Sequence, residues 1–163
     1  MCSLRTGMTA AVLLAGIGFA SADANEGPFA AFDGMWSGNG TISLADGTKE
    51  RIRCRNQYLV TKQATNLQQA LRCSSDRYDF HVNTYVDADE AGVLSGSWTE
   101  MTRNITGRIN GKVDGNRVTV SVGAGGAFSA TMSIVTAGNR QSVRIEPTGL
   151  DVTLVAVQLN RAK

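Results

Sequence analysis

Hydrophobic and polar residues alternate with a period of two along most of the chain beyond residue 34. In segment 49–60, for example, Ile52, Cys54 and Tyr58 fall on one face, while the other face carries charged side chains. Alternation of this kind is typical of antiparallel strands with one face buried. It predicts strands near residues 35–44, 49–60, 67–74, 77–87, 92–101, 105–114, 116–122, 127–136, 140–147 and 150–161.

The breaks between these segments have turn chemistry. Ala45-Asp46-Gly47, Asp114-Gly115-Asn116 and Ala137-Gly138-Asn139 supply residues that tolerate positive φ. Short strands joined by short turns predict an all-β fold, a single antiparallel up-and-down β-barrel of about 8–10 strands, with a β-sandwich as the alternative. A helix is the alternative for residues 62–71, where two leucines are four apart.

The first 24 residues have the pattern of a secretory signal peptide. Arg5 precedes an apolar run over residues 8–20, and Ala22-Asp23-Ala24 is a small-x-small cleavage site. The run is shorter than the roughly 20 residues that span a bilayer. We therefore expect a signal peptide over 1–24, a leader over 25–33 and a barrel domain over 34–163. The mature protein is expected to be periplasmic or secreted, without a membrane span.

Cleavage leaves two of the three cysteines, Cys54 and Cys73. Export and an even cysteine count predict one disulfide between them. If their strands form a hairpin that turns near residues 62–65, both sulfur atoms lie on the inward face.

Charge is nearly balanced overall, with 16 Lys and Arg against 14 Asp and Glu, which argues against a nucleic-acid-binding protein. It is uneven locally, because residues 49–77 are rich in basic side chains and residues 78–100 contain no Lys or Arg. The candidate face for an anionic envelope component, such as a lipid headgroup, comprises Lys49, Arg51, Arg53, Arg55 and Arg72. The alternative is a solvated strand face that is neutralised across strands.

The expected hairpins also assign neighbours on this face. The disulfide register places Arg55 opposite Arg72, and a following turn at 74–77 places Arg72 opposite Asp79. Like charges directly opposite one another are unfavourable, and the aspartate partly relieves them.

Two glycine-x-tryptophan motifs occur, Gly34-Met35-Trp36 and Gly96-Ser97-Trp98. With the first motif on the first strand, the chain resembles the lipocalin and other calycin-like barrels, and also small exported bacterial barrel proteins. The resemblance implies barrel closure by Trp36, with Arg161 packed over its ring. The alternative is that both tryptophans are only core residues.

Large side chains are expected inside the barrel. The candidate ligand-binding residues are Tyr58, Phe80, Trp98, Phe128 and Met132. Small residues at inward positions either leave room for a ligand or let the sheet bend; they are Gly96, Gly107, Gly111 and Ala130.

Catalysis has little support in the sequence. His81 is the one histidine, its strand position faces outward beside Asp79, and the G-x-S-x-G motif is absent. We expect no catalytic residues, no metal site and no cofactor. The expected function is an exported, non-enzymatic, lipocalin-like binding protein that holds a small apolar ligand in the barrel or a partner on its surface. The alternative is a periplasmic inhibitor or envelope-associated interaction protein with a solid barrel core.

Overall fold

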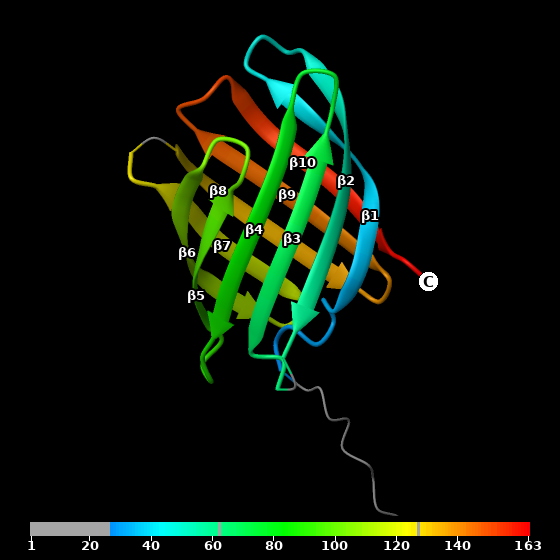
Figure 1. The fold of residues 1–163 in the computed structure, drawn as a ribbon, viewed down its shortest axis with the longest axis vertical. Coiled ribbons are helices and arrows are strands. Elements are labelled where there is room, and N and C mark those ends of the chain that lie inside the picture. The colour runs from blue at the N-terminus through cyan, green and yellow to red at the C-terminus, as the bar shows by residue number, and fades with distance from the viewer. Residues whose placement is uncertain (1–26, 62, 127) are drawn as a thin grey trace, which may run out of the picture.

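Ten strands close into one antiparallel barrel in the computed structural model, which describes residues 27–61, 63–126 and 128–163 (Figure 1). Each strand pairs with its neighbour in sequence, and β1 closes the sheet against β10. The up-and-down barrel is confirmed, and the expected signal peptide lies outside the described residues. The strands are β1 (Gly34–Leu44), β2 (Lys49–Val60), β3 (Asn66–Ser74), β4 (Asp79–Ala88), β5 (Val93–Glu100), β6 (Ile105–Asp114), β7 (Arg117–Ala124), β8 (Phe128–Ala137), β9 (Arg140–Thr148) and β10 (Val152–Arg161).

Residues 62–71 do not form the alternative helix. Most of this segment belongs to β3, which pairs with β2 on one side and β4 on the other. Leu67 and Leu71 are four residues apart on this strand, so their side chains lie on the same face. Both point into the barrel. Within the described ranges there is no helix long and apolar enough to cross a membrane.

Residues 27–33, here called the plug segment, lie across one end of the barrel (Figure 1). Phe29 and Phe32 are buried, and their rings meet edge to face with centroids 5.9 Å apart. The Phe32 ring meets Tyr58 of β2 in the same way at 5.3 Å, and the Phe29 backbone N–H donates to the Ala64 carbonyl. The segment expected to be a leader is therefore part of the folded core at this closed end.

Trp36 and Arg161 meet beside the plug segment. The Trp36 side chain is fully buried, and its Nε1–H donates to the Phe32 carbonyl at 2.7 Å. The Arg161 guanidinium lies over the Trp36 ring, 4.5 Å from its centroid, and donates to the carbonyls of Asp33 and Ala31. One arginine thus ties the last strand to the first strand and to the plug segment.

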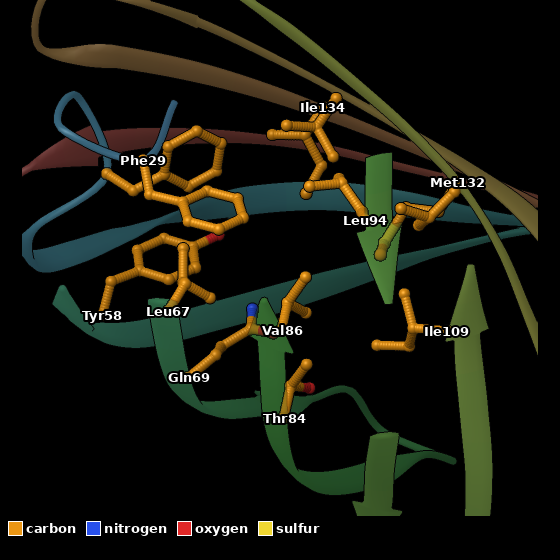
Figure 2. A pocket seen from close by; sticks show the side chains of 13 residues that line it. Phe29, Tyr58, Leu67, Gln69, Thr84, Val86, Leu94, Ile109, Met132 and Ile134 are labelled. Atoms are coloured by element: carbon orange, nitrogen blue, oxygen red, sulfur yellow. The ribbon is translucent and has the colours of Figure 1, made fainter. Parts of the chain in front are cut away.

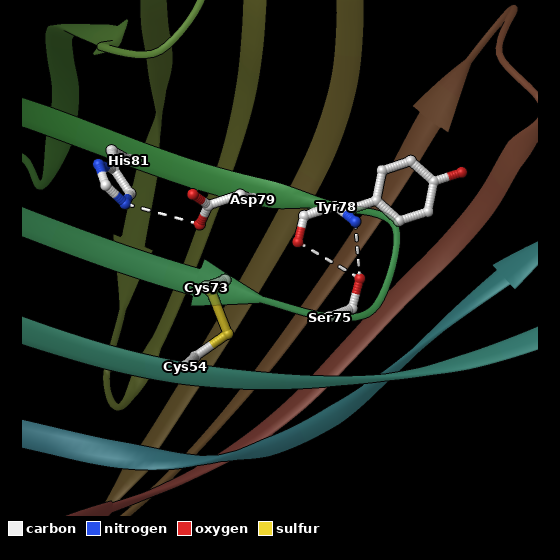
Figure 3. The surroundings of a disulfide bond; sticks show 6 residues. All are labelled: Cys54, Cys73, Ser75, Tyr78, Asp79 and His81. Carbon is white, nitrogen blue, oxygen red and sulfur yellow. Dashed lines mark hydrogen bonds and ion pairs between the residues drawn. A yellow bond between two sulfur atoms is a disulfide. The ribbon is translucent and has the colours of Figure 1, made fainter.

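The disulfide joins Cys54 of β2 to Cys73 of β3, as predicted (Figure 3). The two cysteines are directly opposite in the hairpin, and Arg55 is opposite Arg72 on the outer face. The expected pairing of Arg72 with Asp79 is wrong, because Arg72 lies opposite His81. The β3–β4 turn comes one residue later than expected, and a shift of one residue in a turn moves the pairing by two.

Candidate ligand-binding cavity

A cavity of about 540 Å³ lies inside the barrel, between the plug segment and the open end. Volumes of this order are typical of sites for small organic ligands. The cavity is inconsistent with the alternative of a solid barrel core. All five candidate ligand-binding residues line it: Tyr58, Phe80, Trp98, Phe128 and Met132.

A smaller hollow of about 40 Å³ lies against the plug segment (Figure 2). Phe29 contributes to its wall, together with Gln69 of β3 and Thr84 of β4. These two polar residues, Tyr58 and Met132 also line the main cavity. The hollow is therefore adjacent to the main cavity at the closed end.

One side of the main cavity is apolar. Strands β6–β10 and the β9–β10 turn contribute only apolar side chains to its wall. The larger members of this apolar wall are Ile105, Ile109, Val122, Phe128, Met132, Ile134, Val143, Ile145, Leu150, Val152, Val155, Val157 and Leu159.

The opposite side, on β2–β5, carries hydrogen-bonding groups among its apolar residues. Tyr58, Gln69, Thr84 and Trp98 are successive cross-strand neighbours, so they form one row across four strands. Asn56 lies on β2 two residues before Tyr58 and faces inward with it. We call these five residues the polar strip.

The Tyr58 side chain is held in place by a chain of hydrogen bonds. Its hydroxyl donates to Gln141 Oε1 at 2.9 Å, and Gln141 Nε2 donates to Thr136 Oγ1 at 3.1 Å. Burial raises the pKa of Tyr58 far above that of a free phenol. The phenol is therefore neutral and its proton is committed to Gln141.

Two other atoms of the polar strip lack a partner. Asn56 Oδ1 and Trp98 Nε1 are buried and make no hydrogen bond to any described residue. The Asn56 side chain is only 2% exposed. Because nearly all buried polar atoms in folded proteins are hydrogen-bonded, these two are exceptions that need an explanation.

The Trp98 ring lies against the backbone of Gly107, its neighbour on β6. A Cβ at residue 107 would come within 2.5 Å of the indole, so only glycine leaves room for this ring position. The ring also meets Phe128 edge to face at 5.7 Å. None of the four small inward residues, Gly96, Gly107, Gly111 and Ala130, lines the cavity.

Glu100 and Arg103 stand near the open end of the cavity. The buried Glu100 carboxylate accepts from the backbone N–H groups of His81, Thr102 and Arg103, and forms an ion pair with the Arg103 guanidinium at 3.4 Å. Burial by itself raises the pKa of Glu100, but these N–H donors outweigh it and lower the pKa to about 2. Arg103 also lies 5.5 Å from the centroid of the Phe80 ring.

The basic face is on the outside of β2 and β3, away from the cavity. Its five side chains are exposed, and none forms an ion pair with any described residue: Lys49, Arg51, Arg53, Arg55 and Arg72. The five basic side chains therefore lie on one surface, where no acidic side chain of the described residues pairs with them.

His81 is half-buried on the outer side of β4, where its Nε2 lies 3.6 Å from Asp79 Oδ1 (Figure 3). The nearby Ser75 hydroxyl accepts from the Tyr78 backbone N–H at 2.9 Å. In the part of the chain that the structure describes, no group of three or more His, Cys, Asp and Glu side chains is placed to hold a metal ion.

Several cavity residues were missed at the sequence level, namely Asn56, Gln69, Thr84, Glu100 and Arg103. For the first three, strand parity was the available signal, because they share a face with the apolar residues two positions away. Arg103 follows the end of β5, where strand parity no longer applies.

Comparison with solved structures finds the same fold at low sequence identity. Rv2717c from M. tuberculosis superposes with a TM-score of 0.64 and 14% identity, covering 82% of this chain and 94% of that chain. The S-type phycobiliprotein lyase CPES from Guillardia theta gives a TM-score of 0.53 and 13% identity, covering 83% of this chain and 90% of that chain. No protein-family model and no curated protein matches the chain. These likenesses show that the chain shares the β-barrel fold of both proteins.

Proposed function

We propose that this is an exported, non-enzymatic protein that holds a small, largely apolar ligand inside its barrel. The observation that carries the proposal is the 540 Å³ cavity, which has an apolar wall over five strands. Apolar cavities with a few placed polar groups are the usual form of small-molecule sites. The plug segment closes one end, so the ligand enters through the opposite end.

Three features support a binding role over catalysis. The one histidine lies outside the cavity, and the buried Glu100 carboxylate is held ionised by three backbone N–H groups. The buried Tyr58 phenol is neutral and bonded to Gln141. These groups are committed to structure.

Native mass spectrometry of the protein purified from its own host tests this function. We expect a retained small molecule that dissociates on unfolding. Val143→Phe adds bulk to the apolar wall and should abolish the added mass, provided that its thermal unfolding remains cooperative. Repeated absence of added mass in the wild type, together with no uptake of apolar probes, would contradict the proposal.

A second candidate function is docking of the basic face on an anionic envelope component. The observation that favours it is the register that places Arg55 directly opposite Arg72. Like charges in opposite positions weaken a sheet. A bound anion on this face would offset that repulsion.

A further inference from the structure

We propose that the ligand is a neutral amphiphile, with an apolar body and at least one hydroxyl, carbonyl or amide group that bonds to the polar strip. This inference rests on the proposed function, since it specifies what the cavity binds. It follows from three separate properties of the cavity wall.

The first property is the pair of unpartnered atoms. Asn56 Oδ1 is an acceptor and Trp98 Nε1 is a donor, and both side chains line the cavity. Leaving a buried polar atom without a partner destabilises a protein substantially. Neither atom is open to the cavity in this structure, so each side chain must turn toward the cavity to bond to a ligand hydroxyl, a partner that a hydrocarbon cannot offer.

The second property is the one-sided distribution of polar groups. Gln69 and Thr84 lie in the same cross-strand row as Trp98, so hydrogen-bonding groups are continuous over β3–β5. The apolar wall on β6–β10 offers no donor or acceptor side chain. A ligand polar group is therefore directed to β2–β5, and its hydrocarbon part to β6–β10.

The third property is the absence of a free charge in the described wall. Arg103 is the one basic side chain among the described lining residues, and it is paired with the buried Glu100. The positive charge of Arg103 is thus already balanced by Glu100. A buried charge without a partner is strongly disfavoured, so a neutral polar group is favoured over a carboxylate at the polar strip.

Displacement of a neutral fluorescent probe, N-phenyl-1-naphthylamine, by dodecanol, dodecanoate and dodecane tests the inference. We expect dodecanol to displace the probe at a concentration about tenfold lower than either of the others. Equal displacement by dodecanol and dodecane would overturn the role of the polar strip and imply that water satisfies these atoms. Tightest binding of dodecanoate would overturn the charge argument.

Two variants assign the effect to the polar strip. Asn56→Leu, which removes the amide at similar volume, should reduce the preference for dodecanol over dodecane by about tenfold. Trp98→Phe removes the indole N–H and should reduce the same preference. It provides the test by itself should Asn56→Leu fail to fold. The matched control is Val143→Thr, which changes a side chain of the apolar wall. It should not reduce the preference for dodecanol over dodecane.

The two levels of the proposal fail differently. If the probe does not bind the wild-type protein at all, the proposed function fails. If the probe binds but the dodecanol preference is absent, or survives both polar-strip variants, only the inference about a neutral amphiphile fails.

Discussion

The guanidinium of Arg161 stacks on the buried indole of Trp36, with 4.5 Å between the charged carbon and the ring centroid. The same side chain donates to two carbonyls of the plug segment. A planar cation with several donors is the side chain suited to both contacts at once. The contact holds the end of β10, the start of β1 and the plug segment together.

Arg161→Ala should therefore lower the free energy of unfolding by about 1–3 kcal/mol. Arg161→Lys should recover only part of this, because lysine keeps the charge but not the planar fork. Urea unfolding measures both effects. Arg140→Ala, at an exposed position of β9, is the control and should have little effect; equal values for the two alanine variants would contradict the assigned role.

Removing the disulfide should destabilise the barrel without changing its topology. The Cys54→Ser/Cys73→Ser double variant is expected to lose about 3 kcal/mol, since the bond closes a short loop across one hairpin. Equilibrium unfolding under non-reducing conditions measures the loss. A thiol assay on the unfolded wild-type protein should detect neither cysteine, and two reactive thiols from this pair would show that the bond is absent in solution.

Glu100 predicts a specific loss of stability in acid. Its folded pKa of about 2 is below the ordinary value of 4.5, so its ionised form stabilises the fold above pH 4.5. That contribution disappears as the pH falls from about 4.5 to about 2. Glu100→Gln should lower the free energy of unfolding at neutral pH by about 1–3 kcal/mol. The difference in free energy of unfolding between wild type and Glu100→Gln should shrink near pH 2. The control Glu146→Gln, at an exposed site, should show a much smaller pH-dependent difference. A difference for Glu100→Gln that stays constant from pH 4.5 to pH 2 would contradict the prediction.

The basic face should bind anionic surfaces in a salt-sensitive way. The Arg51→Ala/Arg53→Ala/Arg55→Ala variant is expected to lose most sedimentation with vesicles of anionic phospholipid. A variant with three arginines removed elsewhere, at Arg117, Arg140 and Arg144, is the charge-matched control. Equal loss in both would assign the binding to net charge and not to this face.

One of these substitutions, made alone, also tests the repulsion between Arg55 and Arg72. Arg55→Ala removes the charge directly opposite Arg72, so we expect unchanged or slightly increased stability. Urea unfolding of this single variant separates the binding role of the face from any structural role. A clear destabilisation would show that Arg55 has a stabilising contact beyond its register neighbours.

The fold was largely predictable because its information is local. One face of each strand is buried, and turn residues punctuate the alternation, so the predicted strand limits lie within two residues of the observed ones. The turn that set Arg72 against Asp79 was wrong by one position. Residues 74–77 and 75–78 offer similar turn chemistry, and the hydrogen bond between Ser75 N–H and the Tyr78 carbonyl decides between them.

The candidate site was only partly predictable. Large apolar side chains at inward positions were assigned to the cavity wall, where the structure places them. Asn56, Gln69 and Thr84 have the same parity, but a polar side chain in an inward position conflicts with a simple hydrophobic pattern. The role of Phe29 and Phe32 was hidden for another reason: a short segment without strand periodicity reveals its burial only through tertiary contacts.

The pairing of β1 with β10 has a consequence for how the chain acquires its structure. Trp36 finds its partner Arg161 only after all the strands from β2 to β10 have been made, so barrel closure comes late in the synthesis of this barrel. Until then β1 and the last completed strand both present unpaired edges, which are open to pairing with other chains. A molecule that lacks β10 has two such permanent edges. C-terminal truncation should therefore cause aggregation, even though the cavity's polar strip lies entirely on the earlier strands.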